Sequence, residues 1–272
     1  ATRLFTPIAS LWHEPVRIEG EGTLLARPMG ALLEPLRTLG VAVRDRGGRL
    51  PLEGCGPMRG GAVTVDGSLS SQFVTGLLLA LPLAAGETTV RVTDPVSTPY
   101  IDMTLDTAAR FGVEICRNGY EEVFVEGMQR YAPATMEIEG DWSAAAMLLV
   151  AGATAGEVCV RNIRTLSKQA DTAVIRALER AGAGLVCEAG SVTAARRPLR
   201  AFEFDATHCP DLFPALAALA AAADGTSLLR GVRRLRHKES DRAEAIRSEY
   251  GRLGIEVVID ENAAQLLTRE QT

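Results

Sequence analysis

The sequence predicts an α/β (α+β) fold of repeated βαβαββ units, each about 71 residues long, arranged in two domains. The first supporting observation is a set of four glycines that are spaced by 72, 70 and 72 residues: Gly40, Gly112, Gly182 and Gly254. An apolar segment follows each glycine, and glycine is the residue expected just past a helix end. The second observation is that the segments between these glycines also repeat in kind and order.

Each copy is expected to begin with a strand and a short polar turn that leads into an apolar helix rich in Ala and Leu. These turns are found at 66–72, 140–144 and 205–211. A helix that is apolar on all sides is buried, so this is the inner helix of the unit. A turn containing glycine then leads to a second strand. These strands are expected at 87–92, 157–163 and 226–232.

An amphipathic outer helix and two closing strands complete the unit. Segment 239–254 carries Ala243, Ile246, Tyr250 and Leu253 at helical spacing on one face. The segment 113–127 shows the two closing strands around a turn. A duplicated packing unit needs no function of its own. The repeat does predict, however, that residues at equivalent places lie at the same edge of their units.

The first copy begins at Ala1 within its inner helix, so we expect the chain to be a piece of a longer protein. The segment 131–136 contains Pro133 and precedes the third copy. It is the predicted domain boundary, and it divides the chain into domains 1–132 and 133–272.

Composition excludes several classes of protein. The net charge of -5 and the pI of about 5.4 argue against a nucleic-acid-binding protein. Pro82 interrupts the longest apolar run, so no membrane span is expected. The first ten residues lack a basic stretch that leads into a long apolar core, so no signal peptide is expected. The cysteines are scattered, odd in number and without a C-x-x-C pair, which indicates reduced, mostly buried thiols in a cytoplasmic protein. They are Cys55, Cys116, Cys159, Cys187 and Cys209.

Polar residues gather at the predicted helix starts, in the same register of the repeat. Before the inner helices they are Ser70, Ser71, Gln72 and Asp211; before the outer helices they are Arg27, Ser97, Tyr100, Lys168, Lys238, Glu239 and Arg242. Helix N-termini favour anions, and arginine binds phosphate or carboxylate through two donors. Asp211 and Glu239, with Lys238, are candidates for a base and an acid. The pattern indicates an enzyme that acts on a small phosphorylated substrate.

Each of these residues also has a purely structural interpretation. Ser70 or Ser71 is equally suited to capping a helix, and Asp211 is suited to the same task. The charged run 238–242 is also typical of a solvated surface. His208 beside Cys209 suggests a metal site, but no second pair of ligands accompanies it, so no metal is expected.

Four motifs occur in an order and spacing that resemble the EPSP synthase (3-phosphoshikimate 1-carboxyvinyltransferase) family. They are "ARPMG" at 26–30, "DGSLSSQF" at 66–73, "STPYID" at 97–102 and "HKESDR" at 237–242. The resemblance runs from Ala1 to near the C-terminus and implies the enolpyruvyl transferase fold. That fold has two domains of three βαβαββ units with the active site in the cleft. The chain then matches the middle four units, with domain 1–132 short at its N-terminus and domain 133–272 at its C-terminus.

The resemblance implies transfer of the enolpyruvyl group of phosphoenolpyruvate (PEP) to the 5-hydroxyl of shikimate 3-phosphate, with release of phosphate. This is a step of the shikimate pathway to chorismate and aromatic amino acids, and it needs no metal or organic cofactor. The implied ligands of shikimate 3-phosphate are Ser70, Ser71, Gln72, Ser97, Tyr100, Asp211 and Lys238, and those of PEP are Arg3, Arg27, Gln72 and Arg242. Asp211 is implied as the base toward the hydroxyl, and Glu239 with Lys238 as the group that moves the proton on the PEP methylene carbon.

The chain departs from the family pattern in ways that bear on activity. It lacks the family's early lysine, its Asn-Ala-Gly-Thr segment and its C-terminal Asp-His-Arg and lysine segments. It also has Arg234 where the family often has a substrate-contacting asparagine. PEP should therefore bind weakly to the isolated chain, and a non-catalytic fragment of the shikimate enzyme is a second interpretation.

Two related classes of protein share features with this chain. The enolpyruvyl transferase that acts on UDP-N-acetylglucosamine carries a reactive cysteine five residues before the arginine of the "ARP" loop, where this chain has Gly22. An RNA 3′-phosphate cyclase-like protein has the same repeat type, but the acidic charge and the missing nucleotidylation histidine motif argue against it. The expected partners are therefore the two small substrates, not nucleic acid or membrane, and the protein is expected to be a monomer.

Overall fold

The second copy of the repeat shows the complete predicted unit in the computed structural model, which describes residues 1–237, 241–260 and 263–267. Its elements are β4 (Arg59–Asp66), α3 (Ser71–Ala80), η3 (Leu81–Leu83), β5 (Ala85–Thr93), α4 (Thr98–Arg110), β6 (Ile115–Asn118) and β7 (Glu122–Val125). The strands lie in the order β4-β5-β7-β6, and β4 and β5 are parallel while the other pairs are antiparallel.

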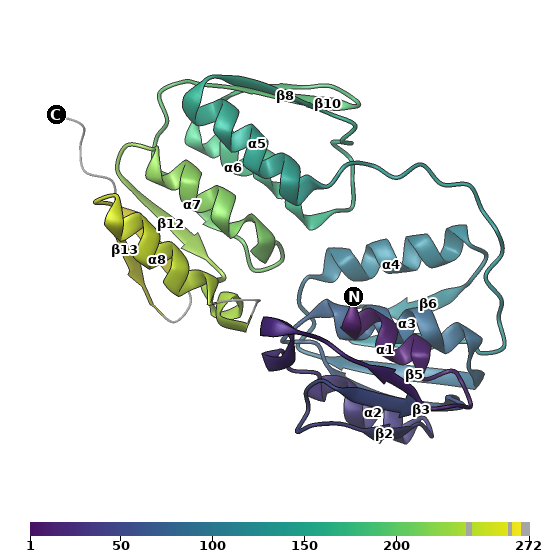
Figure 1. Cartoon of the computed structure of the whole chain (residues 1–272). Coiled ribbons are helices and arrows are strands. Elements are labelled where there is room, and N and C mark those ends of the chain that lie inside the picture. Colours follow the sequence, from purple (N-terminus) through teal and green to yellow (C-terminus); the bar gives the residue numbers. More distant parts are fainter. Residues whose placement is uncertain (238–240, 261–262, 268–272) are drawn as a thin grey trace. The chain divides into compact units, whose positions relative to one another are not determined.

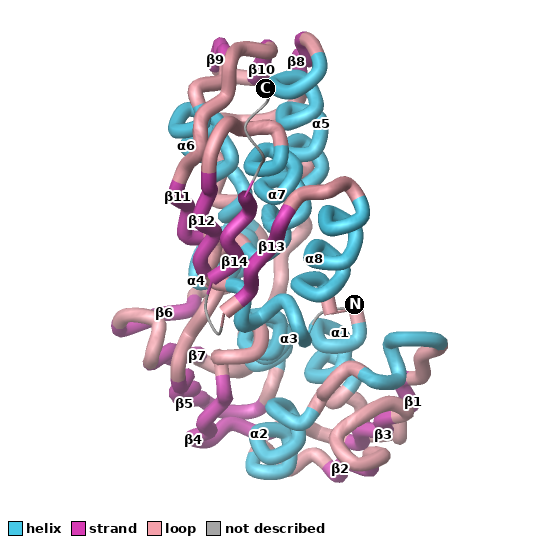
Figure 2. The backbone as a smooth tube through the Cα atoms, turned by 90° about the vertical axis from the view of Figure 1, so that its left-hand side faces the viewer, coloured by secondary structure: helices cyan, strands magenta, loops and turns pink. Residues whose placement is uncertain are grey.

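The fourth copy repeats this topology. Its elements are β11 (Glu203–Asp205), η5 (Pro210–Leu212), α7 (Phe213–Ala221), β12 (Thr226–Arg230), η6 (Val232–His237), α8 (Arg242–Arg252), β13 (Glu256–Ile259) and β14 (Ala263–Leu267). Figure 2 shows its strands side by side in the order β11-β12-β14-β13, which corresponds to the order of the second copy. The parallel pair is again formed by the two strands that flank the inner helix. The predicted βαβαββ unit is therefore confirmed for these two copies.

The first and third copies lack the opening strand. The first consists of α1 (Thr2–Ala9), β1 (Val16–Ile18), η1 (Gly22–Ala26), η2 (Gly30–Leu32), α2 (Leu33–Thr38), β2 (Ala42–Arg44) and β3 (Leu52–Cys55), with sheet order β1-β3-β2. The third consists of α5 (Trp142–Ala155), β8 (Glu157–Arg161), η4 (Ala170–Ala173), α6 (Val174–Ala181), β9 (Gly184–Cys187) and β10 (Ser191–Ala195), with sheet order β8-β10-β9.

The missing strand of the third copy corrects the prediction that every copy except the first opens with one. The segment before α5 pairs with none of the described strands, although Gly140 N donates to Asn162 O at 2.6 Å. Side chains fasten the rest of it: Arg164 lies 2.8 Å from the carboxylate of Glu137, and Ser167 donates to Glu139 at 2.5 Å. Side-chain bonds thus take the place of the ladder.

The chain divides into two compact units, Ala1–Thr135 and Met136–Thr272 (Figure 1). The sequence places the boundary slightly earlier, between residues 132 and 133. Tyr131 Oη donates to Leu79 O at 3.0 Å and Ala132 N donates to Phe111 O at 2.7 Å. These bonds attach residues 131 and 132 to the first unit.

The predicted glycine punctuation is confirmed in all four copies. Gly40, Gly112, Gly182 and Gly254 have φ angles of 85°, 80°, 87° and 79°, a conformation that side chains with a Cβ rarely adopt. Each glycine therefore ends its outer helix and directs the chain into the closing strands.

Each unit has its own hydrophobic core around the inner helices. Phe73 of α3, Trp142 of α5 and Phe213 of α7 are each at most 1% exposed. In the first unit α1 packs directly on α3 at Gly76, where an added Cβ would lie 2.5 Å from Arg3 O. The glycine thus allows the two helix backbones to touch.

The expectation that the cysteines are mostly buried is wrong. Cys209 is buried, but Cys116, Cys159 and Cys187 are exposed, and Cys55 is intermediate. The exposed three lie on strands, where alternate residues face solvent. All five thiols are free. Within the described residues, no helix combines the length and the apolar character that crossing a membrane requires.

Candidate active site

The start of α3 shows what the "SSQ" segment does locally. Ser70 is the N-cap residue, with extended backbone, and its Oγ accepts a hydrogen bond from Gln72 N at 3.3 Å. Ser70 and Ser71 are 9% and 6% exposed, while Gln72 is exposed. Ser70 therefore caps the helix, and the side chains of Ser71 and Gln72 take no part in that bond.

The turn before this helix is held closely to strand β5. Gly67 N donates to Thr93 O at 2.8 Å, and an added Cβ on Gly67 would lie 2.7 Å from Val92 Cγ1. Asp66 Oδ1 accepts from Ser68 N at 2.9 Å. No larger residue fits at Gly67 unless its neighbours move, so the position of the serines relative to the sheet is well defined.

Ser97 and Tyr100 lie at the start of the neighbouring helix, α4. Because β4 and β5 are parallel, the turns that follow them leave the sheet at the same edge. Ser97 is the N-cap residue and is 2% exposed, with φ 52° and ψ 41°, in the left-handed region that is unusual for serine. Thr75 and Thr104 join α3 to α4 through their hydroxyls at 3.0 Å. The structure therefore brings the two predicted serine-containing helix starts to one edge of one unit.

The loop that carries Arg27 and Pro28 is fastened on two sides. Met29 N donates to Gly48 O at 2.7 Å, and Arg3 Nη2 donates to Pro28 O at 3.1 Å. The guanidinium of Arg3 also lies over the ring of Phe73, 4.6 Å from its centroid. Arg3, the "ARP" loop and the start of α3 are thus in contact within the first unit.

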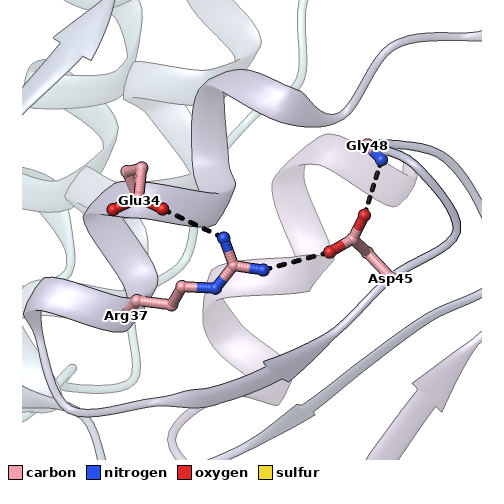
Figure 3. A network of polar contacts seen from close by, with 4 residues as sticks. All are labelled: Glu34, Arg37, Asp45 and Gly48. Atoms are coloured by element: carbon pink, nitrogen blue, oxygen red, sulfur yellow. Dashed lines mark hydrogen bonds and ion pairs between the residues drawn. The ribbon is translucent and has the colours of Figure 1, made fainter.

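A network of charged residues supports Gly48 from the other side (Figure 3). Arg37 of α2 pairs with Glu34 at 3.0 Å and with Asp45 at 3.1 Å, and Asp45 accepts from Gly48 N at 2.5 Å. Asp45 has a side-chain exposure of only 14%. The network holds the turn whose carbonyl anchors the Arg27 loop.

In the second unit the structure pairs Asp211 with Arg242. Arg242 Nη1 lies 2.7 Å from Asp211 Oδ1, and the two side chains are 27% and 37% exposed, Arg242 being the less exposed. The N-cap residue of α7 is Leu212, without a side-chain cap, so the interpretation that Asp211 caps this helix is wrong. Asp241 caps α8 by accepting from Glu244 N at 3.0 Å. Two members of the predicted site, Lys238 and Glu239, lie outside the described residues.

The third copy has a polar cluster at the equivalent place, of which the sequence pattern indicated only Lys168. Ser143 Oγ donates to Asp171 Oδ2, and Asp171 is 1% exposed. Gln169 joins the helix start to the preceding segment: its Oε1 accepts from Trp142 N and its Nε2 donates to Gly140 O, both at 2.9 Å. The register of "GDWSA" with "DGSLSSQ" is the sequence signal for this cluster.

The idea of a metal at His208 and Cys209 finds no geometric support. Among the residues that the structure describes, no group of three His, Cys, Asp or Glu side chains is placed to hold a metal ion. Burial raises the pKa of the Cys209 thiol to about 12.

Hydrogen-bond donors, helix starts and arginines dominate the candidate residues of the first unit, and a carboxylate with its guanidinium partner is the main feature of the candidate residues of the second unit. Donors around a helix N-terminus suit a phosphate or carboxylate. A fixed carboxylate suits removal of a proton from a hydroxyl. The described groups can therefore bind anions and carry out acid–base chemistry.

Comparison with known proteins gives one consistent match. Residues 1–271 match the model of the family described as EPSP synthase (3-phosphoshikimate 1-carboxyvinyltransferase). The 3-phosphoshikimate 1-carboxyvinyltransferase of Methanocorpusculum labreanum is 40% identical over 243 residues, which are 88% of this chain and 57% of that protein. The enzyme of the same name from Clostridium kluyveri is 35% identical, over 96% of this chain and 62% of that protein.

A solved structure agrees with these sequence matches. The structure of EPSP synthase from Acinetobacter baumannii superposes with a TM-score of 0.78 at 26% identity, covering 98% of this chain and 63% of that one. The fold class inferred from the repeat is therefore confirmed. The chain spans less than two thirds of the length of these relatives. On the family match over residues 1–271, the chain belongs to the EPSP synthase (3-phosphoshikimate 1-carboxyvinyltransferase) family.

Proposed function

We propose that this chain carries the central part of an enzyme that transfers the enolpyruvyl group of PEP to the 5-hydroxyl of shikimate 3-phosphate and releases phosphate. The observation that carries the proposal is the edge of the first unit where the "SSQ" helix start and the Ser97 helix start meet. Relatives named 3-phosphoshikimate 1-carboxyvinyltransferase support the same reaction.

Shikimate 3-phosphate is proposed to bind through its phosphate at this edge. Ser71 and Gln72 are in the first turn of α3, where backbone N–H groups and the helix dipole favour an anion. Ser97 and Tyr100 add polar groups from α4. Ser70 has a dual task, because its hydroxyl already caps the helix and retains an O–H that can donate to the phosphate.

PEP is proposed to bind through its phosphate and carboxylate to Arg27, Gln72 and Arg242. Arginine presents two parallel donors to such groups, and Arg27 is carried by a loop with two backbone fastenings. In the breakdown of the tetrahedral intermediate the bond from C2 to the phosphate oxygen breaks, and arginines stabilise the negative charge that develops on the departing phosphate. Arg3, the third arginine of the predicted PEP set, donates to Pro28 O of this loop and is not among the proposed ligands.

Asp211 is proposed as the base that accepts the proton of the 5-hydroxyl while that oxygen attacks C2 of PEP. Its pairing with Arg242 orients the carboxylate. The methylene carbon C3 takes a proton at the same stage, for which Glu239 and Lys238 are the proposed source. Loss of this proton and of phosphate then yields the enolpyruvyl ether. Atoms balance without any metal or redox step.

Binding measurements on the purified chain test the proposal. In isothermal titration, shikimate 3-phosphate should bind more tightly than PEP, because "SSQ", Ser97, Tyr100 and Asp211 are all present while several family cations are not. Ser71→Ala should weaken the binding of shikimate 3-phosphate about tenfold, because one hydrogen bond to a charged group is lost. Ser68→Ala is the matched control, since this exposed serine lies in the same turn.

Four outcomes would contradict the assignment or redirect it. Tighter binding of PEP, or no binding of shikimate 3-phosphate by a folded chain, would exclude the proposed site. Binding of UDP-N-acetylglucosamine instead would favour the sister transferase. Binding without phosphate release identifies a chain that is not catalytic by itself. In the longer protein, Asp211→Ala should lower turnover by about 10²- to 10⁴-fold, a far larger effect than its effect on substrate affinity.

A cytoplasmic monomer is the proposed state of the protein. Three exposed free thiols suit a reducing compartment, because exposed cysteines pair readily under oxidising conditions. Sedimentation equilibrium tests the monomer, and a concentration-dependent mass would contradict it.

A further inference from the structure

We infer that Arg3 is a positioning residue that holds the Arg27 loop against the first turn of α3, and that it is not a ligand of PEP. The inference rests on the proposed function for its consequence, because Arg27 and Gln72 are two of the three proposed PEP ligands. Its evidence is independent of any substrate. It assigns to Arg3 a role different from the one that the family resemblance implies.

The two described contacts of Arg3 join segments that are far apart in the sequence. Nη2 donates to Pro28 O at 3.1 Å, and the guanidinium lies over the ring of Phe73, 4.6 Å from its centroid. Pro28 directly follows Arg27, and Phe73 directly follows Gln72. A single side chain therefore connects the neighbours of Arg27 and Gln72, the two proposed PEP ligands of the first unit.

The position of Arg3 is set by close helix packing. An added Cβ at Gly76 would lie 2.5 Å from Arg3 O and 3.2 Å from Leu4 Cα, so the backbone of α1 rests on α3 at this point. Phe73 is fully buried and Arg3 is 5% exposed. Neither partner of the stacking contact has room to move, and the guanidinium is directed by its surroundings rather than by solvent.

Pro28 would be poorly fixed without this bond. Proline has no N–H to donate, so its carbonyl is its one strong backbone hydrogen-bonding group, and Arg3 satisfies it. The next residue, Met29, is fixed through its N–H to Gly48 O at 2.7 Å. Together the two bonds hold the loop just after Arg27, one toward α3 and one toward the 45–48 turn.

A guanidinium fits this task better than an ammonium group. It is planar, so it can stack on Phe73 with its face while it donates to Pro28 O along its edge. A lysine can donate to the carbonyl but cannot stack in the same way. Arg3→Lys should therefore still hold the Arg27 loop in part, and Arg3→Met should not hold it at all.

Hydrogen exchange of the chain without any substrate tests the inference. In Arg3→Met, amides of the 27–32 peptide, including Met29 N, should exchange about tenfold faster or more, the effect of losing one hydrogen bond to a charged group. Arg3→Lys should show an intermediate rate. Amides of β4 and β5 should be unchanged. Arg110→Met, which removes an exposed arginine at the end of α4, is the matched control.

A second variant approaches the same contact from the other partner. Phe73→Leu keeps every polar group in place, removes only the ring and largely conserves apolar volume, so it should also accelerate exchange of the 27–32 peptide. Where substrate binding is measurable, Arg3→Met and Phe73→Leu should weaken the binding of PEP by a similar factor. If Arg3→Met unfolds the whole unit, exchange of the 27–32 peptide in Arg3→Lys and Phe73→Leu tests the positioning role of Arg3 instead.

Unchanged exchange of the 27–32 peptide in folded Arg3→Met would overturn the inference, as would unchanged exchange in Phe73→Leu. A ligand role predicts this pattern, since a ligand residue acts only when PEP is present. Failure of the proposed function looks different: the exchange result would stand while neither substrate bound.

Discussion

A single methyl group at Gly76 should destabilise the first unit, although the same change usually stabilises a helix. Gly76 lies within α3, and alanine in a helix interior is favoured over glycine by about 1 kcal/mol. Against this, the new Cβ would lie 2.5 Å from Arg3 O and 3.2 Å from Leu4 Cα. Both atoms belong to the backbone of α1, so no flexible side chain can yield, and the two helices must separate.

The size of the effect follows from these two contributions. Forcing a methyl group into a filled contact costs about 1–3 kcal/mol. Separation of α1 also weakens the stacking and hydrogen bond of Arg3, each of which contributes about 1–2 kcal/mol when buried. After the gain in helix propensity is subtracted, Gly76→Ala should lower the free energy of unfolding of the first unit by about 1–3 kcal/mol.

Gly251 provides a matched control for this prediction. It lies in α8, and nothing comes within 4 Å of an added Cβ. Gly251→Ala should therefore stabilise the second unit by about 0.5 kcal/mol, since only the conformational freedom of glycine is lost. Urea titration followed by hydrogen exchange and mass spectrometry reports the two units separately. If Gly76→Ala and Gly251→Ala changed the free energy of unfolding of their units in the same direction, the reasoning from backbone contact at Gly76 would be refuted.

Two further predictions concern titrating groups. Because burial raises the pKa of Cys209 to about 12, its thiol should react with disulfide reagents at pH 8 at least tenfold more slowly than Cys116, which is exposed; equal rates would contradict this. Hydrogen bonds from Thr207 lower the pKa of Asp205 in the folded chain. The carboxylate therefore stabilises the fold at pH values above its pKa in the unfolded chain, and this stabilisation is lost as the pH falls through its pKa in the folded chain. Thr207→Val should therefore reduce stability at pH 7 and change it little at pH 2, as measured by urea titration at both pH values.

The repeat was predictable because the sequence features that define it depend only on neighbouring residues. A glycine past a helix end is needed for its positive φ wherever an outer helix turns into a strand, so four glycines at even spacing are visible in the sequence alone. The absence of an opening strand in the third copy was not predictable, because a strand depends on a neighbour that the local sequence does not contain. There the pairs Glu137 with Arg164 and Glu139 with Ser167 hold the segment in place of a ladder.

Those parts of the candidate site that lie at helix starts were predictable, because helix starts can be recognised in the sequence. Ser70 is the N-cap residue, one of the two serines that its segment offers for capping, and Ser97 lies at the helix start that its segment predicts. The partner of Asp211 was not predictable from local pattern, because capping explains an aspartate before a helix equally well. The pairing with Arg242, 31 residues away, appears only when η5 and α8 are folded together. The role of Arg3 likewise depends on the contact between α1 and α3.

The four copies share one polar contact between the inner helix segment and the outer helix segment. The pairs are Arg3 with Pro28, Thr75 with Thr104, Ser143 with Asp171 and Asp211 with Arg242, separated by 25, 29, 28 and 31 residues in the sequence. The chemistry differs in each copy, and the Thr75–Thr104 pair joins helix interiors while the other pairs involve a loop or a helix start. A polar link between the two helix segments therefore occurs in every copy.

This common link changes how a loss of activity in Asp211→Ala is interpreted. The variant removes both a base and the partner of Arg242, and truncating one partner of a charged pair destabilises by itself. Asp211→Asn separates the two effects, because its amide oxygen still accepts from Arg242 but is no base. If Asp211 acts only through the scaffold, Asp211→Asn should keep turnover in the longer protein. If it is the base, turnover should fall as far as in Asp211→Ala while the second unit keeps its stability.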